Sequence, residues 1–411
     1  MARSAAGLGI MLDLLKGTRV ISFNHFLLGP MGIQALGDLG ADVVSVETPE
    51  GAWQRHWSSG DIWHDGQSAL HLCANRNKRS VAIDLKTPEG RELALRLVDT
   101  ADVVAENFRP GVMEKLGLGY EALKARRPSL IYASASGYGP DGPYAAKPGQ
   151  DLLAQALFGL MAITGQAATG PRPAGVSVVD HHGAAVFAVG ILAAIVRRQR
   201  IGQGCRVDAS LMQAALDLQS ESLVAWANAP VRPPATHAFR HVAAWYYAAP
   251  YGVYATKDGH LAVSLSPLKL VGDALDEPRL GAFSDRDSWS RQDEITALIA
   301  ERLKTRTTAE WCARMEPMKI WHAPVRGYQE IAEDPQVKHM RSLVTVPGCG
   351  DTGAPLTLVN HPVLYDGEAA EVHLPPQRLG AQTEEVLQEI GLADAEIAAL
   401  AQSGVIKLRD A

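Results

Sequence analysis

The strongest constraint on the fold is an alternation, between residues 18 and 134, of short apolar runs and helical patterns. Helical patterns at 32–39, 90–98 and 123–127 separate the runs, and Thr87-Pro88-Glu89 has the pattern of a helix N-terminus. Because strand–helix–strand units join parallel strands by right-handed crossovers, we expect an α/β fold whose parallel sheet is covered on both faces. The expected strands are residues 18–23, 42–46, 80–85, 102–105 and 130–134.

The rest of the chain indicates further helices and a second architecture. Helical patterns cover residues 150–163, 180–200 and 384–402, a strand is expected at 205–211, and a hairpin pattern at 251–265 is followed by helices at 293–304 and 309–315. We therefore predict three parts. They are a large domain at 13–225, a smaller α+β domain at 226–340, and a C-terminal segment at 341–411 that returns to the large domain.

Charge, cysteine content and hydropathy exclude several classes of protein. The 39 Lys and Arg residues and 45 Asp and Glu residues give a net charge of −6, which argues against a nucleic-acid-binding protein. The four cysteines are far apart and form no CxxC pair, so we expect no disulfides, no zinc site and a cytoplasmic location. No run reaches the ~20 apolar residues of a membrane span. The best candidate, at 184–196, is interpreted as a buried core helix, and the segment before residue 13 is a poor signal peptide.

Familiar motifs of nucleotide-dependent and hydrolytic enzymes are missing from the sequence. No GxGxxG follows a strand and no GxxxxGK[ST] is present, which disfavours a dehydrogenase and a nucleoside triphosphatase. GxSxG is absent, which disfavours an α/β-hydrolase, and so is HExxH, the helical zinc motif. We therefore expect no metal and no NAD. The tryptophan-rich segment with Trp53, Trp57 and Trp63 receives no role from the sequence.

One carboxylate, Asp180, lies where a strand-like run at 176–179 meets a long helical pattern. Asp is a preferred N-cap residue, so helix capping alone accounts for it. A strand end next to a helix start is also the usual ligand crevice of an α/β sheet. Backbone N–H groups there would keep the carboxylate ionised, and an ionised carboxylate can attack a thioester to give an acyl-enzyme anhydride. Both interpretations stay open at this point.

Basic and polar residues gather upstream of this carboxylate, at 75–80, Lys86, 107–109 and Lys115. Solvated loops ordinarily carry such residues. Several of these positions, however, fall at or after the ends of expected strands, where cations suit an anionic, nucleotide-like ligand.

Seven stretches of the chain closely resemble the class III CoA-transferases, the family that includes formyl-CoA and carnitine CoA-transferases and, as relatives, the α-methylacyl-CoA racemases. They occur in the family's order and are spread over roughly half of the chain. The stretches are GP…LGDLGADVVSVE (29–47), NRNKRSVAIDLKTPEG (75–90), ADVVAENFRPG (101–111), SGYGPDGPY (136–144), PGQDLLAQALFGLM (148–161), VVDHHGA…GILAA (178–194) and GQGCRVDASL (202–211).

The resemblance implies a role for particular residues. Asp180 would accept the acyl group of an acyl-CoA, form an aspartyl-CoA thioester through a mixed anhydride, and pass CoA to a carboxylic acid acceptor. Other positions would bind the coenzyme A of the substrate. Lys86, Arg109 and Lys115 would face its phosphates, Ile83 and Phe108 would flank adenine, Asn107 would be a further contact, and Gln150 and Asp151 would lie near the thioester, although Asp151 also suits a helix N-cap.

The resemblance also implies a Rossmann-like large domain, a smaller domain, and a homodimer of two interlocked chains. Racemases carry a His where this chain has Gln150, and Gln cannot exchange a proton at neutral pH, so racemisation is disfavoured. Leu27 and Thr48 depart from the formyl-CoA enzyme, and Leu27, Leu28 and residues 245–247 hint at a larger or more apolar acyl group. We expect a CoA-transferase. The alternatives are an acyl-CoA racemase or isomerase, a non-catalytic CoA-binding protein and, on the α/β alternation alone, a nicotinamide-dependent oxidoreductase.

Overall fold

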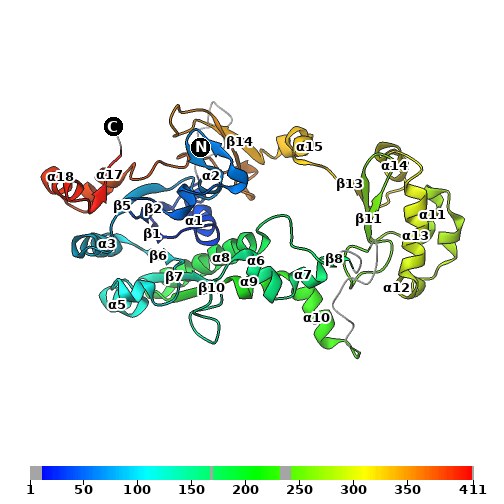
Figure 1. Ribbon diagram of the computed structural model, residues 1–411, viewed down its shortest axis with the longest axis horizontal. Coiled ribbons are helices and arrows are strands. Elements are labelled where there is room, and N and C mark those ends of the chain that lie inside the picture. The colour runs from blue at the N-terminus through cyan, green and yellow to red at the C-terminus, as the bar shows by residue number, and fades with distance from the viewer. Residues whose placement is uncertain (1–11, 167–169, 232–241, 410–411) are drawn as a thin grey trace. The chain divides into compact units, whose positions relative to one another are not determined.

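The computed structural model of the chain describes residues 12–166, 170–231 and 242–409 (Figure 1). The chain forms two compact units. The first comprises the described parts of Met1–Ala154, Ser177–Leu218 and Asp334–Ala411, and the second those of Gln155–Val176 and Gln219–Glu333. The predicted large domain therefore includes residues 155–176 and 219–225, which belong to the second unit, and the predicted smaller domain includes residues 334–340, which belong to the first.

The first unit is built on a seven-stranded sheet with the strand order β10-β7-β6-β1-β2-β5-β18. All neighbouring strands pair in parallel except β18, which pairs antiparallel with β5. The predicted α/β fold with a parallel sheet is confirmed, and each expected strand is present to within two residues. The strands are β1 (Arg19–Phe23), β2 (Asp42–Glu47), β5 (Arg79–Ile83), β6 (Val103–Glu106), β7 (Ile131–Ser136), β10 (Arg206–Ser210) and β18 (Ile406–Lys407).

Helices cover both faces of this sheet. Five of them contribute to one hydrophobic cluster with the strands: α3 (Pro88–Thr100), α4 (Val112–Lys115), α5 (Tyr120–Arg126), α17 (Thr383–Glu389) and α18 (Asp394–Gln402). Two others, α1 (Leu28–Asp38) and α8 (Val178–Ile201), contact β2, β6, β7 and β10 without joining that cluster, so they cover the other face. The predicted start of α3 is confirmed, because the Thr87 hydroxyl accepts the N–H of Gly90 and Pro88 occupies the first turn.

Smaller elements complete the first unit. The helices are η1 (Trp53–Arg55), η2 (Ser59–Asp61), α2 (Ala69–Ala74), α6 (Asp151–Leu157, which continues into the second unit), α9 (Leu211–Leu218) and α16 (Pro335–His339). The two-stranded sheets are β3 (Trp63–His64) with β4 (Gln67–Ser68), β14 (Leu343–Val346) with β15 (Leu356–Val359), and β16 (Leu364–Tyr365) with β17 (Glu368–Ala369).

Two local predictions are wrong in instructive ways. The strand-like run at 176–179 is not a strand, because Val178 and Val179 already belong to α8. A short run with three valines in four residues cannot be distinguished from the buried start of a helix by periodicity, and Val179 is fully buried. The single helix expected at 150–163 is divided in two by Gly159, which adopts φ 91°.

The second unit contains a three-stranded antiparallel sheet packed against helices. Its largest fully buried side chains are Trp311 and Tyr254. The strands are β11 (Gly252–Ala255), β12 (His260–Val263) and β13 (His322–Pro324), with the hairpin β8 (Gly165–Gln166) and β9 (Gly170–Pro171). The helices are α7 (Leu160–Ile163), α10 (Ser220–Asn228), α11 (Leu268–Leu275), η3 (Pro278–Ala282), α12 (Asp287–Ser290), α13 (Gln292–Leu303), α14 (Thr308–Met315) and α15 (Tyr328–Glu333).

Candidate active site

The order of strands in the large sheet reverses between β1 and β6. From β1 the chain continues to β2 and β5 on one side, and from β6 to β7 and β10 on the other. Ligands of open α/β sheets bind at the carboxyl ends of the strands at such a point. Asn107, the first residue after β6, joins the two loops there. Its Oδ1 accepts the N–H of His25 at 2.8 Å and its Nδ2 donates to the His25 carbonyl oxygen at 2.7 Å.

Asp180 lies at this edge of the sheet, although it does not cap its own helix. It is the third residue of α8, partly exposed, and the backbone N–H of Leu28, the first residue of α1, donates to its carboxylate. Glycines allow the two helices to approach closely. A Cβ on Gly32 would lie 2.9 Å from the Ala184 carbonyl oxygen, and one on Gly183 would lie 2.6 Å from Leu28 Cδ1. The packing of α1 on α8 thus sets the distance between Leu28 and Asp180.

Asp151 supplies the capping that the sequence assigned to Asp180. Its Oδ1 accepts the N–H of Val179 at 2.8 Å and the N–H of Asp180 at 3.0 Å, while the N-cap residue Ser177 makes no side-chain capping bond. Asp151 therefore caps α8 from the start of α6, 29 positions earlier in the chain than Asp180. Gln150, directly before Asp151, is exposed.

The environment of Asp180 favours the protonated form more than the sequence indicated. Burial, and to a smaller extent the negative charge of Asp151, raise the pKa of Asp180 to about 7, although the hydrogen bond from Leu28 lowers it. The prediction that backbone N–H groups keep this carboxylate ionised is therefore wrong. One N–H group does not compensate for the loss of solvation and for a second carboxylate nearby.

The three predicted phosphate contacts follow the carboxyl ends of β5 and β6 in the chain. Lys86 lies in the loop after β5, Arg109 lies in the loop after β6, and Lys115 is the last residue of the short helix α4. All three side chains are exposed, and none forms an ion pair with another residue of the described chain. Arg109 also lines a cavity of about 290 Å³ beside β6, β7 and β10. These cations are available to an anionic ligand.

The two predicted adenine contacts differ in accessibility. Phe108 is partly exposed and its ring lies 5.2 Å from the ring of His25, centroid to centroid. Ile83, by contrast, is fully buried in the core of the sheet. A contact between the Ile83 side chain and a ligand would need this side chain to be exposed, and the structure does not expose it.

The polar cluster at 75–80 is neither a solvated loop nor an anion site. It runs into the start of β5, at the amino end of that strand, and its side chains are bound within the fold. The Arg76 guanidinium forms a bidentate pair with Asp38 at 2.9 and 2.6 Å, and Lys78 Nζ donates to Pro30 O, Ala74 O and Asn75 Oδ1 at 2.7, 2.7 and 3.0 Å. These charges serve the fold, because buried charges need partners.

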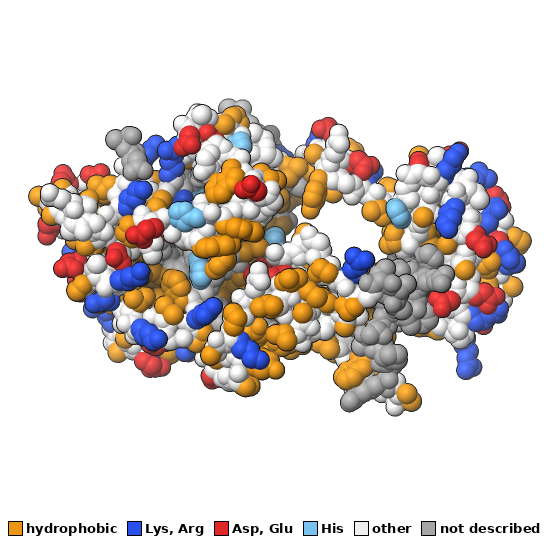
Figure 2. Space-filling view, viewed as in Figure 1, with side chains coloured by type: hydrophobic (Ala, Val, Ile, Leu, Met, Phe, Trp, Pro, Cys, Tyr) orange, Lys and Arg blue, Asp and Glu red, His pale blue; other side chains and the backbone are white. Residues whose placement is uncertain are grey.

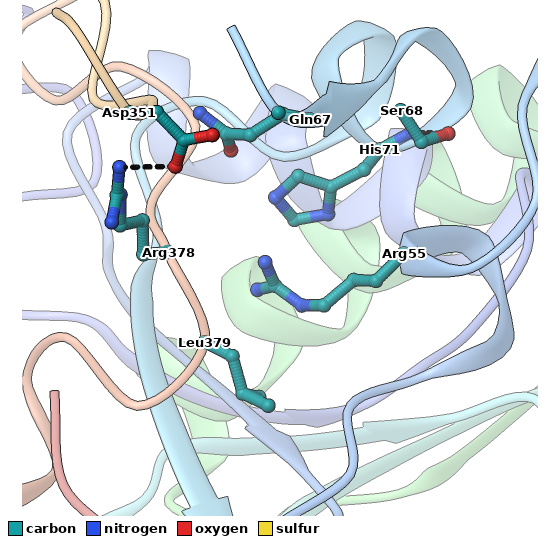
Figure 3. Close-up of a pocket in the computed structure, with 8 residues that line it drawn as sticks. Arg55, Gln67, Ser68, His71, Asp351, Arg378 and Leu379 are labelled. Atoms are coloured by element: carbon teal, nitrogen blue, oxygen red, sulfur yellow. Dashed lines mark hydrogen bonds and ion pairs between the residues drawn. The ribbon is translucent and has the colours of Figure 1, made fainter. Parts of the chain in front are cut away.

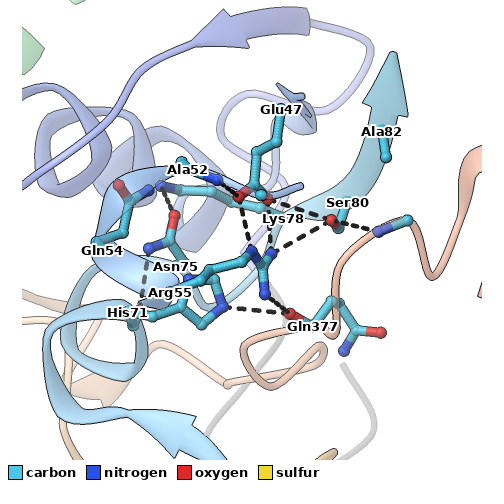
Figure 4. Close-up of polar contacts among 12 residues, drawn as sticks. Glu47, Ala52, Gln54, Arg55, His71, Asn75, Lys78, Ser80, Ala82 and Gln377 are labelled. Carbon is cyan, nitrogen blue, oxygen red and sulfur yellow. Dashed lines mark hydrogen bonds and ion pairs between the residues drawn. The ribbon is translucent and has the colours of Figure 1, made fainter. Parts of the chain in front are cut away.

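A second polar network surrounds Glu47 at the end of β2 (Figure 4). The Arg55 guanidinium donates to both Glu47 oxygens at 2.6 Å, and its Nη1 donates to the Gln377 carbonyl oxygen at 3.1 Å. Burial alone would raise the pKa of Glu47, but the charge and hydrogen bonds of Arg55, with smaller contributions from His71 and the Ala52 N–H, together lower the pKa to about 2. Arg55 also lines a cavity of about 170 Å³ with His71 and Arg378, whose guanidinium is paired with Asp351 at 2.7 Å (Figure 3).

The described residues contain no group of three or more His, Cys, Asp or Glu side chains that could hold a metal ion. The candidate site consists of a carboxylate, Asp180, at the carboxyl edge of an α/β sheet, with exposed cations in neighbouring segments.

The family model of CoA-transferase family III matches residues 15–383. The chain belongs to CoA-transferase family III. The expectation of a class III CoA-transferase is confirmed.

Relatives and solved structures agree with this family. An acyl-CoA transferase of Fusarium pseudograminearum is 33% identical over 408 residues, which cover 95% of this chain and 88% of the relative. A succinate–glutarate CoA-transferase of Agrobacterium fabrum is 32% identical over 394 residues, covering 92% and 95%. The crystal structure of a CAIB/BAIF family protein from Brucella suis matches with a TM-score of 0.78 at 29% identity, covering 92% of this chain and 99% of that one.

Proposed function

We propose that this family III CoA-transferase moves CoA from an acyl-CoA to a free carboxylic acid, with Asp180 as the nucleophile. The observation that carries the proposal is the position of the Asp180 carboxylate. It is partly exposed, it contacts the N–H of Leu28, and it lies where the chain leaves β1, next to the reversal of strand order. The name of the Agrobacterium relative, which refers to succinate and glutarate, supports a carboxylic acid as the acceptor.

The first half of the proposed reaction transfers CoA to the enzyme. An oxygen of the ionised Asp180 attacks the thioester carbonyl, the C–S bond breaks, and CoA leaves as a thiolate. The CoA thiolate then attacks the aspartyl carbonyl of the mixed anhydride. The C–O bond to the aspartyl group breaks, the donor acid leaves as a carboxylate, and CoA is held as an aspartyl thioester.

The second half runs the same chemistry in reverse with the acceptor. Its carboxylate attacks the aspartyl carbonyl and releases the CoA thiolate, which then attacks the acceptor's own carbonyl in the new anhydride. The new acyl-CoA forms and Asp180 returns as a carboxylate. A backbone N–H such as that of Leu28 can stabilise charge that develops on a carboxyl oxygen at this position.

The exposed cations suit the binding of the coenzyme A portion of the substrate. Lys86, Arg109 and Lys115 would hold phosphate groups, and Phe108 would contact adenine. Their contacts are the same in the ground state and the transition state, so they would contribute to affinity rather than to the chemical step.

We also propose that the enzyme acts as a homodimer with a second, smaller domain in each chain. The exposed face of α8 supports a subunit contact, because Val186, Val189 and Val196 are 41, 64 and 43% exposed. The prediction of a buried core helix thus holds for one face of α8, where Phe187 and Ile191 are buried. Figure 2 shows hydrophobic side chains gathered over α6, α8 and α9.

By length and composition α8 could also cross a membrane, but core helices of soluble proteins pass the same test.

Covalent trapping tests the proposal. The protein is incubated with a set of acyl-CoAs, quenched with hydroxylamine or borohydride, and its peptides are mapped by mass spectrometry. We expect modification at Asp180, and loss of both modification and CoA transfer in Asp180→Asn, which keeps the shape but has no nucleophilic oxygen.

Matched variants separate chemistry from folding. Asp217→Asn changes an exposed aspartate of α9 that pairs with His182 of α8, the helix that carries Asp180, and we expect it to keep full transfer. Transfer by Asp180→Asn at the wild-type rate would contradict the proposal. Exchange of the α-proton of the acyl group with deuterated water, without transfer, would instead support a racemase.

A further inference from the structure

A row of five ring side chains crosses the carboxyl edge of the sheet, which we call the aromatic row. It consists of Phe108, His25, Phe26, Trp53 and Trp57, in that order. Consecutive ring centroids are 5.2, 4.7, 4.8 and 5.0 Å apart, within the range of direct aromatic contacts. The residues come from three segments, after β6, after β1 and around η1. The sequence showed the tryptophans but not that they continue a row of rings.

The outer part of the aromatic row is exposed and firmly held. Phe26, Trp53 and Trp57 are 42, 46 and 47% exposed. Phe26 adopts φ 60°, a conformation rare for a bulky residue, and its N–H donates to the Oε1 of buried Gln54 at 3.1 Å. The Trp57 carbonyl oxygen accepts a hydrogen bond from Ser68 at 2.7 Å. Strained backbone of this kind persists where surrounding contacts over-determine it, and it gathers at ligand sites.

The aromatic row passes close to the proposed nucleophile. Phe26 and Leu28 are separated by one residue, so their Cα atoms are at most ~7.6 Å apart. The N–H of Leu28 contacts the Asp180 carboxylate, and the opposite end of the row is Phe108, the proposed adenine contact. The middle of the row thus lies at the reacting end of the substrate, whereas Phe108 lies at the nucleotide end.

We propose that Phe26, Trp53 and Trp57 form the subsite for the acyl group, and that this enzyme acts on acyl-CoAs whose acyl group carries an aromatic ring. The proposal rests on the function proposed above. Flat rings stack on exposed aromatic faces in offset or tilted arrangements, and a short charged acyl group gains nothing from them. The occupant is therefore an aryl or arylalkanoyl group.

The charges around the aromatic row support an apolar occupant. His25 is neutral near pH 7, because burial lowers its pKa. Arg55, the neighbour of Trp53 in η1, directs its guanidinium to both oxygens of Glu47 and is 12% exposed. No member of the row offers a positive charge to a second carboxylate. A dicarboxylic acyl group, as in the name of the Agrobacterium relative, is a poor match here.

Donor specificity tests the inference. We would measure kcat/KM for phenylacetyl-CoA and succinyl-CoA with acetate as the acceptor, in the wild type and in Trp53→Ala. We expect phenylacetyl-CoA to be preferred, and Trp53→Ala to lower its kcat/KM roughly tenfold more than that of succinyl-CoA, mainly through KM. Trp53→Phe keeps an aromatic face and should keep most of the preference.

A matched control lies in the same segment. Trp63 is 44% exposed and its Nε1 donates to Asp61, but its ring is not part of the aromatic row. Trp63→Ala should leave the ratio of the two kcat/KM values unchanged. Equal effects of Trp53→Ala on both donors, a preference for succinyl-CoA, or a change in oligomeric state with Trp53→Ala would overturn the inference.

A binding measurement separates this inference from the proposed function. Asp180→Asn cannot form the anhydride, so its tryptophan fluorescence can be titrated with phenylacetyl-CoA and with CoA without turnover. Tighter binding of phenylacetyl-CoA that disappears in the Asp180→Asn, Trp53→Ala double variant supports the subsite, even if Asp180 is never acylated. Equal affinity for the two ligands refutes the subsite, even if Asp180 is the nucleophile.

Discussion

The acidity of Asp180 should depend on Asp151, and Asp151→Asn tests this directly. The substitution removes a negative charge but keeps an Oδ1 that can accept the N–H groups of Val179 and Asp180. Burial is the larger cause of the raised pKa of Asp180 and is unchanged. We therefore expect the pKa of Asp180 to fall below 7 without reaching the value of an exposed aspartate.

The size of the effect follows from the fraction of Asp180 that is ionised. With a pKa of about 7, roughly 3% of Asp180 carries charge at about pH 5.5. Each unit by which the pKa falls raises this fraction nearly tenfold, up to a limit of ~30-fold. Because only the carboxylate attacks the thioester, acylation by Asp151→Asn at about pH 5.5 should exceed that of the wild type, while the two agree at about pH 8.5.

The free energy of unfolding should also increase in Asp151→Asn. A carboxyl whose folded pKa is raised from 3.8 to about 7 costs stability as pH rises between these values, because the unfolded chain releases its proton first. The cost is zero below about pH 4 and reaches about 4 kcal/mol above pH 7. Asp151→Asn should reduce it, so the variant should be the more stable protein at about pH 8.

The assay is the pH profile of kcat/KM, which reports the ionisation of the free enzyme, together with urea unfolding at about pH 5 and 8. Asp151→Ala is the control, because it removes the charge and also the cap of α8. An acidic limb that stays at the same pH in Asp151→Asn would refute the reasoning, and so would a wild-type limb near pH 4.

Three further predictions concern the fold around the site. Glu106→Gln should stabilise the protein by about 3 kcal/mol at about pH 8 and hardly at all at about pH 4 in urea unfolding, because burial raises the pKa of Glu106 to about 7. Arg76→Ala should cost about 3 kcal/mol by the same measurement, because the buried Asp38 carboxylate loses its guanidinium partner and keeps only His361 and Asn77, whereas Arg126→Ala at an exposed pair should cost no more than about 1 kcal/mol. Gly32→Ala would place a methyl group 2.9 Å from a backbone oxygen of α8. It should destabilise by about 1–3 kcal/mol and slow acylation of the nucleophile while CoA affinity, measured by titration, is unchanged.

Basic residues near the candidate site could be predicted from the sequence to different extents. The type and position of Lys86 and Arg109 predict phosphate contacts, and in the structure both side chains are exposed and form no ion pair with another described residue. Residues 75–80 look similar in the sequence but lie at the opposite edge of the sheet. Their charges are matched by residues such as Asp38, 38 positions away, and Glu389, 310 positions from Arg79. Such pairing leaves no local signal.

The sequence by itself determined the α/β architecture, the start of α3 at Thr87 and Pro88, and the family. These depend on the pattern of neighbouring residues, and local propensity and periodicity are properties of short segments. Tertiary structure alone decided that Asp151 caps α8, that the pKa of Asp180 is raised far above that of an exposed aspartate, and that Trp53 and Trp57 continue the ring contacts of Phe26. Each of these depends on burial and on contacts between segments far apart in the chain, and desolvation and Coulomb interactions depend on distance in space rather than in sequence.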